Sequence, residues 1–71
     1  MKTVLLTGAA GSIGVALRRE LKGVYGELRL ADIKAINDVG PGETFHRLDI
    51  ADAGALNAAM KGVDGVIHMA G

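Results

Sequence analysis

The sequence contains no cysteine and only two histidines in 71 residues. Without cysteine, a disulfide scaffold and a zinc site with thiolate ligands are both excluded, and the composition fits the reducing cytoplasm. The two histidines, His46 and His68, are isolated from each other and make a poor metal site. We therefore expect a cytoplasmic protein without a bound metal.

Net charge and long apolar runs are also missing. Eight basic residues balance eight acidic ones, so the chain lacks the positive surface that nucleic acids or anionic membranes attract. Its apolar runs fall far short of the roughly 20 residues of a membrane helix, and the first residues show no signal-peptide pattern. These absences leave a small-molecule binder as the favoured class, with no nucleic acid and no membrane as partner.

The chain contains strand patterns separated by helical or loop segments. Residues 33–42 have no helical period and carry the turn signal Gly40-Pro41-Gly42, so we expect a loop there. Runs of β-branched and apolar residues predict strands, the third of mixed polarity as on a sheet edge, at residues 3–7, 27–32, 44–48 and 65–69.

Two helices are predicted between these strands. The first begins at Ser12 and ends before Gly23, with an apolar stripe formed by Ile13, Leu17 and Leu21. The residues expected to turn away from the sheet are Arg18, Arg19, Glu20 and Lys22. The second is short, is capped by Asp52 and runs to Lys61. Strands that alternate with helices predict a parallel α/β sheet.

Right-handed crossovers then restrict the topology. If the first three strands step one way and the fourth returns beside the first, the spatial order is 3-2-1-4, with helices on both faces of the sheet. This is a partial Rossmann fold, and its reversal point lies at the carboxyl ends of the first and fourth strands.

The segment TGAAGSIG, residues 7–14, lies at this reversal point. Gly8 would form the tight turn, Gly11 would leave room for a pyrophosphate, and Gly14 would let the helix pack closely on the sheet. The backbone N–H groups of Ser12 and Ile13 would face the phosphate at the positive end of the helix. Three glycines alone are equally compatible with a purely structural turn.

An acid follows the glycine turn by about 20 residues, as the dinucleotide fingerprint requires. This acid, Asp32, would bind the ribose hydroxyls and repel a 2′-phosphate, which favours NAD over NADP. Lys34, two residues later, would soften that repulsion. The alternative is a solvated carboxylate at a strand end.

The end of the third strand carries a second acid. Asp49 could accept from the adenine amino group while the backbone N–H of Ile50 donates to the ring. The alternative is that Asp49 or Asp52 only caps the following helix, a role that suits Asp52 better. In a buried fourth strand, His68 is expected to be a hydrogen-bonded structural residue, and His46 on an edge strand is expected to be solvated.

Four segments in this order, TGAAGSIG, ADI, LDIAD and HMAG, resemble the extended short-chain dehydrogenase/reductase superfamily, specifically its NAD-dependent epimerase/dehydratase group. The similarity covers all 71 residues. Within the group, the uronate dehydrogenases look most similar, since they share the LRLAD strand and the acid-rich segment after the third strand. HMAG departs slightly from the family's usual HLAA or HLGG.

The resemblance implies an NAD site. It places diphosphate contacts on the glycine turn, ribose contacts after the second strand, adenine contacts after the third, and further ribose and diphosphate contacts at the fourth-strand end. The implied cofactor-binding residues are Gly8, Gly11, Ser12, Ile13, Gly14, Asp32, Ile33, Asp49, Ile50, Met69, Ala70 and Gly71.

The same resemblance points to what is missing. The family's reaction uses a tyrosine as general acid/base and a lysine four residues later. The only tyrosine here is Tyr25, and Arg29 stands four residues after it. We therefore expect no catalytic residue, and we expect residues 1–71 to be the N-terminal portion of an NAD-binding Rossmann domain. The strand at residues 65–69 would then be an unpaired edge, available for self-association.

The leading hypothesis is the NAD-binding portion of a sugar-directed oxidoreductase or epimerase/dehydratase, with a hexuronate as candidate substrate of a full-length protein. A non-catalytic dinucleotide-sensing or interaction module is the alternative from another class. An inactive fragment that retains the glycines as a fold feature is the third.

Overall fold

The computed structural model describes residues 2–69. Residues 33–42 form the predicted loop, without helix or strand. The elements, in chain order, are β1 (Thr3–Thr7), α1 (Ser12–Glu20), β2 (Glu27–Asp32), β3 (Glu43–Arg47), α2 (Ala53–Ala59) and β4 (Gly65–His68). Each predicted element is present. β3 begins and ends one residue earlier than predicted, β4 ends one residue earlier, and α2 is shorter than the predicted helix.

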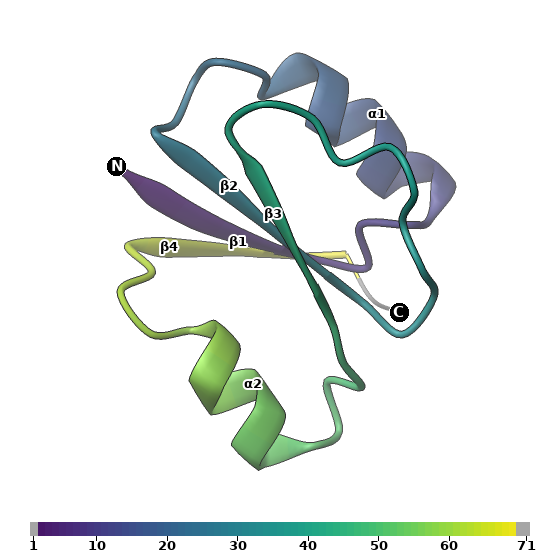
Figure 1. Ribbon diagram of the computed structural model, residues 1–71, viewed down its shortest axis with the longest axis vertical. Coiled ribbons are helices and arrows are strands. Elements are labelled where there is room, and N and C mark those ends of the chain that lie inside the picture. Colours follow the sequence, from purple (N-terminus) through teal and green to yellow (C-terminus); the bar gives the residue numbers. More distant parts are fainter. Residues whose placement is uncertain (1, 70–71) are drawn as a thin grey trace.

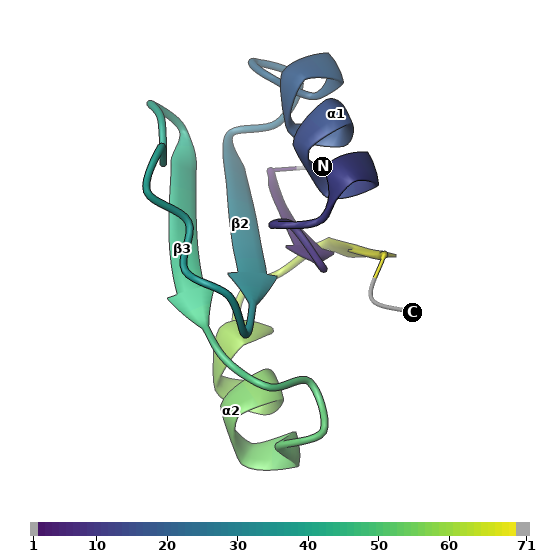
Figure 2. The same cartoon turned by 90° about the vertical axis from the view of Figure 1, so that its right-hand side faces the viewer.

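The strands form one parallel sheet in the order β3-β2-β1-β4, so the predicted partial Rossmann topology is confirmed. Figure 1 shows α1 and α2 on opposite sides of this sheet, and the arrows of β2 and β3 run the same way in Figure 2. All four carboxyl ends therefore meet at one edge of the sheet, where a ligand can contact several strands at once. No helix in the described part of the chain is long and apolar enough to cross a membrane.

The central strand β1 is buried on both faces. Val4 and Leu6 pack with Leu28 and Leu30 of β2 into the main hydrophobic cluster, with residues of α1 against it, whereas Leu5 is fully buried on the other face. This double burial explains why the strand is apolar without alternation. Removing such a leucine would cost about 2–5 kcal/mol, so β1 anchors the turn that follows it.

Arg29 of β2 fastens α2 to the opposite face. Its Nη1 donates to the carbonyls of Ala59 and Lys61, each at 2.7 Å, and its Nε donates to Glu27 at 3.0 Å. Ala59 is the last residue of α2 and Lys61 lies two residues beyond it, at the helix end where carbonyls lack intrahelical partners and a cation is favourable. The ion pair, with a hydrogen bond from Thr44, holds the pKa of Glu27 below its ordinary value.

The prediction that Arg18 turns away from the sheet was wrong. Its side chain is only 9% exposed, and it donates to both carboxylate oxygens of Glu43 at 3.0 and 2.8 Å and to Asp38 at 3.2 Å. The loop at residues 33–42 folds back over α1 and supplies Asp38, so a position that would otherwise be solvated becomes covered. The hydrogen bond from Arg18 is the main cause of the lowered pKa of Glu43.

Two other predictions of side-chain burial were also wrong. Ile13, placed on the apolar stripe, is 61% exposed and, unlike Leu17, is not among the residues packed against the hydrophobic cluster. His68 is exposed rather than buried because, within residues 2–69, β4 pairs only with β1 and forms a sheet edge. His46 is exposed, as predicted.

Candidate functional site

The turn after β1 is built around Gly8. This residue has a φ of 70°, a left-handed conformation that side chains disfavour. Its carbonyl accepts a hydrogen bond from the N–H of Gly11 at 3.1 Å, which closes the turn. The predicted role of Gly8 in the fold is thus explained by backbone conformation alone.

Gly14 and Gly11 are required for different reasons. A Cβ on Gly14 would lie 2.5 Å from the Gly8 carbonyl oxygen and 2.8 Å from the Ala9 Cα, so the start of α1 can approach the turn only without a side chain. A Cβ on Gly11 would meet its nearest neighbour, the same oxygen, at 3.4 Å, an ordinary contact, and Gly11 has an unstrained φ of −73°. The fold itself therefore does not require glycine at position 11.

The first turn of α1 presents backbone donors beside this space. Gly11 is the N-cap, no side chain caps the helix, and the first turn holds no acidic residue. Helix geometry leaves the first N–H groups without intrahelical partners. Ser12 and Ile13 are both exposed at this end, so their N–H groups can donate to an anion at the positive end of the helix dipole.

Asp32, at the end of β2, is joined to the glycine turn. Its Oδ2 accepts from the N–H of Ala10 at 2.9 Å, and its Oδ1 accepts from the N–H of Lys34 at 2.9 Å. The carboxylate is therefore fixed in position and is only partly exposed. Each carboxylate oxygen has more than one acceptor site, so the bound carboxylate can still receive ribose hydroxyls.

The acids after β3 take different positions. Asp52 caps α2, with its Oδ1 accepting from Ala55 at 3.1 Å, so the cap predicted for it is confirmed. Asp49 instead closes a local turn, with its Oδ1 accepting from Ala51 at 2.9 Å. Its carboxylate keeps acceptor capacity toward the neighbouring pocket.

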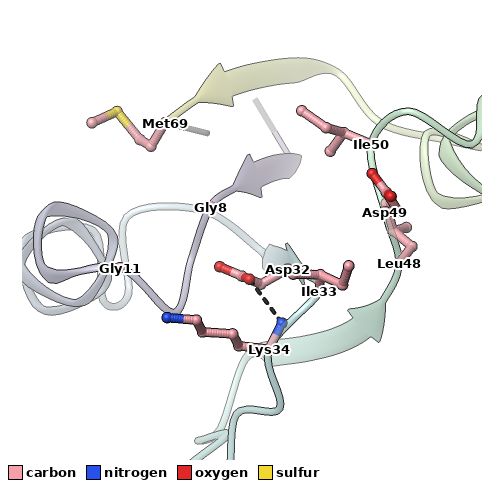
Figure 3. A pocket seen from close by; sticks show the side chains of 9 residues that line it. All are labelled: Gly8, Gly11, Asp32, Ile33, Lys34, Leu48, Asp49, Ile50 and Met69. Carbon is pink, nitrogen blue, oxygen red and sulfur yellow. Dashed lines mark hydrogen bonds between the residues drawn. The ribbon is translucent and has the colours of Figure 1, made fainter. Parts of the chain in front are cut away.

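A pocket of about 310 Å³ opens where these segments meet. Figure 3 shows the side chains around it, which come from the ends of β1, β2 and β3 and from the residue after β4. A volume near 300 Å³ is the lower end for small-molecule sites. The pocket is lined by Gly8, Gly11, Asp32, Ile33, Lys34, Leu48, Asp49, Ile50 and Met69.

Seven of the residues proposed from the sequence are thus brought together in one pocket, and three lie beside it. Gly14 is buried under the turn, while Ser12 and Ile13 are exposed at the start of α1 and do not line the cavity. Ala70 and Gly71 lie outside the described residues. Their cofactor roles stay predictions.

Sequence reasoning did not place Leu48 in the site. It lies just after β3, and its N–H donates to the Asp32 carbonyl at 3.1 Å. The only available signal was its position directly before the predicted adenine contacts. Ile33, Leu48 and Ile50 give the pocket an apolar wall suited to a flat ring.

Other chemistry-bearing side chains lie away from this pocket. Tyr25 packs against the hydrophobic cluster, and Arg29 is bound to α2, so neither contributes to the lining. His68 forms a hydrogen bond between its Nδ1 and the Thr7 hydroxyl at 2.7 Å, which joins β4 to β1. The structural hydrogen bond predicted for His68 is therefore present.

A parallel sheet in the order β3-β2-β1-β4, a glycine turn after β1 and an acid after β2 together define the mononucleotide-binding half of a Rossmann-type domain. Sequence comparison specifies the family. The model of the NAD dependent epimerase/dehydratase family matches residues 4–71, and the chain belongs to this family.

Relatives within the family are similar over nearly the whole chain. A uronate dehydrogenase of Pseudomonas putida is 45% identical over 69 residues, which cover 96% of this chain and 26% of the relative. A uronate dehydrogenase of Agrobacterium fabrum is 44% identical over 100% of this chain and 27% of its own length. The chain therefore spans about a quarter of the length of these relatives.

Solved structures show the same similarity. The crystal structure of a mutant uronate dehydrogenase from Agrobacterium tumefaciens complexed with NAD has a TM-score of 0.93 at 44% identity, covering 100% of this chain and 27% of that one. The crystal structure of glucuronic acid dehydrogenase from Chromohalobacter salexigens has a TM-score of 0.90 at 38% identity, with coverages of 99% and 26%.

Proposed function

We propose that this chain binds the adenosine diphosphate part of NAD and is the cofactor-holding portion of a sugar-directed oxidoreductase. The observation that carries the proposal is that Gly11 and Asp32 line the same pocket. The Ala10 N–H donates to the Asp32 carboxylate and so holds the glycine turn beside this acid. The NAD complex of a uronate dehydrogenase with the same fold supports this choice of cofactor.

Different residues of the pocket bind different parts of the cofactor. The diphosphate lies over Gly11, and its oxygens accept hydrogen bonds from the backbone N–H groups of Ser12 and Ile13. Asp32 receives the ribose hydroxyls, and the apolar wall beyond it contacts adenine, with Asp49 and the Ile50 N–H as its polar partners. Every one of these assignments concerns binding and orientation.

Within a full-length protein, the bound dinucleotide would supply the hydride-accepting carbon at C4 of its nicotinamide. We propose a hexuronate as the substrate of that protein, because the similar curated relatives are uronate dehydrogenases. We also propose that residues 1–71 form the N-terminal portion of its dinucleotide-binding domain, since they correspond to about a quarter of those relatives.

The β4 edge supports a further partner proposal. In the described residues β4 pairs with β1 only, and Val66 on it is 46% exposed. Unpaired edges invite strand addition, so the chain studied alone should self-associate through β4. Light scattering on the 71-residue chain tests this, and the substitution Val66→Lys should shift it toward monomer.

Calorimetric titration with NAD, NADP and ADP-ribose tests the proposed function. We expect submillimolar binding of NAD and ADP-ribose, because the proposed contacts involve the adenosine diphosphate part, and weaker binding of NADP. A folded protein that binds none of the three would contradict the proposal. Turnover of a hexuronate by the protein at its natural length separates an oxidoreductase from a dinucleotide-sensing module, which would bind NAD without turnover.

A further inference from the structure

We propose that Arg47 is a positioning residue of the dinucleotide pocket. Its hydrogen bond to the Ile33 carbonyl joins the two chain segments that carry the apolar wall and fixes the distance between them. The inference rests on the proposed function, because this wall is where the adenine ring would lie.

The apolar wall is built from two separate segments of chain. Ile33 follows β2, whereas Leu48 and Ile50 follow β3. Figure 3 shows Ile33 next to Asp32, and Leu48 and Ile50 on the neighbouring segment. A ring that contacts both segments binds best when their separation is already fixed, because ordering them during binding costs free energy.

The backbone ladder between β2 and β3 ends just before this wall. Asp32 is paired with Arg47, and the Leu48 N–H donates to the Asp32 carbonyl at 3.1 Å. In a continued parallel ladder the next bond would run from the Lys34 N–H to the Leu48 carbonyl, but the Lys34 N–H donates to the Asp32 Oδ1 instead. Within residues 2–69, no backbone hydrogen bond joins the two segments beyond this point.

The Arg47 side chain supplies the missing connection. Its Nε donates to the Ile33 carbonyl at 2.8 Å, and hydrogen bonds from a charged donor are stronger than neutral ones. Among the described residues, this is the only hydrogen bond between residues 33–34 and residues 47–50. Because Leu48 directly follows Arg47 in the chain, the side chain is anchored on one segment of the wall and bonded to the other.

The remaining surroundings of Arg47 suit a local role. Its side chain forms no ion pair among residues 2–69, although Asp32 is its register partner. It is exposed and does not line the pocket, so it acts on the ligand through Ile33. An exposed side chain with one carbonyl partner contributes little to global stability, and its loss should change the wall rather than the fold.

A direct electrostatic role for Arg47 makes a different prediction. A cation that attracted the diphosphate would strengthen the binding of NAD but not of adenosine, which carries no phosphate. A positioning role strengthens the binding of both ligands by similar factors, since both place adenine against the same wall.

The test uses the protein at its natural length with Arg47→Met, in which a methyl group replaces the Nε and the donor is lost. Calorimetry gives the dissociation constant of NAD, and NMR titration gives that of adenosine. We expect R47M to bind both ligands at least about threefold more weakly, by similar factors. Arg47→Lys should restore most of the affinity, because its ammonium group can donate to the same carbonyl.

The protein without ligand provides a second readout. The ¹³C resonance of the Ile33 carbonyl should move in R47M, because its hydrogen bond is lost, and should return toward the wild-type position in R47K. The midpoint of urea unfolding should stay close to that of wild-type protein in both variants. A change in affinity at constant stability separates positioning of the wall from a general structural role.

Arg19→Met is the matched control, because Arg19 is an exposed arginine of α1 that does not line the pocket. It should leave both dissociation constants unchanged. Unchanged affinities in R47M, a loss confined to NAD, or an Ile33 carbonyl resonance that does not move would overturn the inference.

These outcomes leave the proposed function intact as long as wild-type protein binds NAD. Wild-type protein that binds NAD but not adenosine would also overturn the inference, because the wall would then hold no ring by itself. Failure of wild-type protein to bind either ligand would overturn both the inference and the proposed function.

Discussion

The carboxylate of Asp32 and the backbone N–H of Ala10 lie 2.9 Å apart although they are 22 residues apart in the sequence. This bond connects the end of β2 to the glycine turn that follows β1. The acid assigned to the ribose and the turn assigned to the diphosphate are therefore one structural unit.

Replacing Asp32 with asparagine should weaken NAD binding by about tenfold, because a hydrogen bond to a charged group contributes about 1.5–3 kcal/mol. The preference for NAD over NADP should narrow, since the charge that repels the 2′-phosphate is removed. Calorimetric titration with both cofactors measures this. The control is Asp52→Asn, because asparagine caps a helix as well as aspartate does. An unchanged cofactor preference in D32N would defeat the role given to Asp32.

Gly11→Ala should fold normally and bind NAD at least about tenfold more weakly. The added Cβ has only one neighbour, at 3.4 Å, so stability should change by no more than about 1 kcal/mol. Urea unfolding measures stability, and calorimetry measures affinity. Full NAD affinity in G11A would show that no ligand lies against this residue.

Gly14→Ala, in contrast to Gly11→Ala, should lower the stability of the fold. Its Cβ would lie 2.5 Å from a backbone oxygen, and such overpacking costs about 1–3 kcal/mol. Gly54→Ala in α2 is the control, because its Cβ would meet nothing closer than 3.5 Å and alanine favours the helix by about 1 kcal/mol. Equal thermal stability of G14A and wild-type protein would contradict the close approach of α1 to the turn.

Arg18→Ala should destabilise the fold by about 3–5 kcal/mol, because it leaves Glu43 without its partner in a partly buried position. A small domain has only about 5 kcal/mol in total, so this variant should be largely unfolded at 25 °C. Arg19→Ala removes an exposed arginine of the same helix and should change stability by less than about 0.5 kcal/mol. Circular dichroism compares the two, and a well-folded R18A would disprove the structural role of the ion pair.

Acid should remove the contribution of Glu43. Its pKa in the folded chain lies below the ordinary value of 4.5, mainly because Arg18 donates to it. Such a carboxylate adds stability above the ordinary pKa and loses it as the pH falls through the folded one. Glu43→Gln should be less stable than wild-type protein at pH 7, and the difference should shrink toward pH 3.

Urea unfolding at several pH values measures that difference. The control is Glu20→Gln at an exposed position of α1. This variant leaves Glu43 and its ion pair in place, so its difference from wild-type protein in free energy of unfolding does not include the contribution of Glu43. A gap between wild-type protein and E43Q that stays constant from pH 7 to pH 3 would show that the ion pair contributes nothing.

The elements and their order were predictable because their signals are local. The uninterrupted apolar run of β1 reports burial on both faces, and the change of period at Ser12 marks the start of α1. Gly8 also has a local signal, since a left-handed turn selects glycine. Crossover handedness, together with the condition that the fourth strand returns beside the first, then gave the strand order that the structure has.

The contacts that were missed depend on tertiary structure. Arg18 becomes buried only because the loop at residues 33–42 returns over α1 with Asp38, and no periodicity reports the path of a loop. Asp32 was identified as an acid near a ligand, but its bond to Ala10 requires the register of β1 and β2. His68 was expected to be buried because its strand is apolar, yet exposure depends on what lies beside the strand.

The most direct test of the central claim is a titration of the ¹⁵N-labelled protein with NAD, followed by the backbone amide signals in NMR spectra. The account predicts that the largest shifts fall on residues 11–14, 32–34 and 48–50, with smaller ones on α2 and on the amino ends of the strands. Shifts concentrated elsewhere, or none at saturating NAD, would contradict the assignment of the dinucleotide to this pocket.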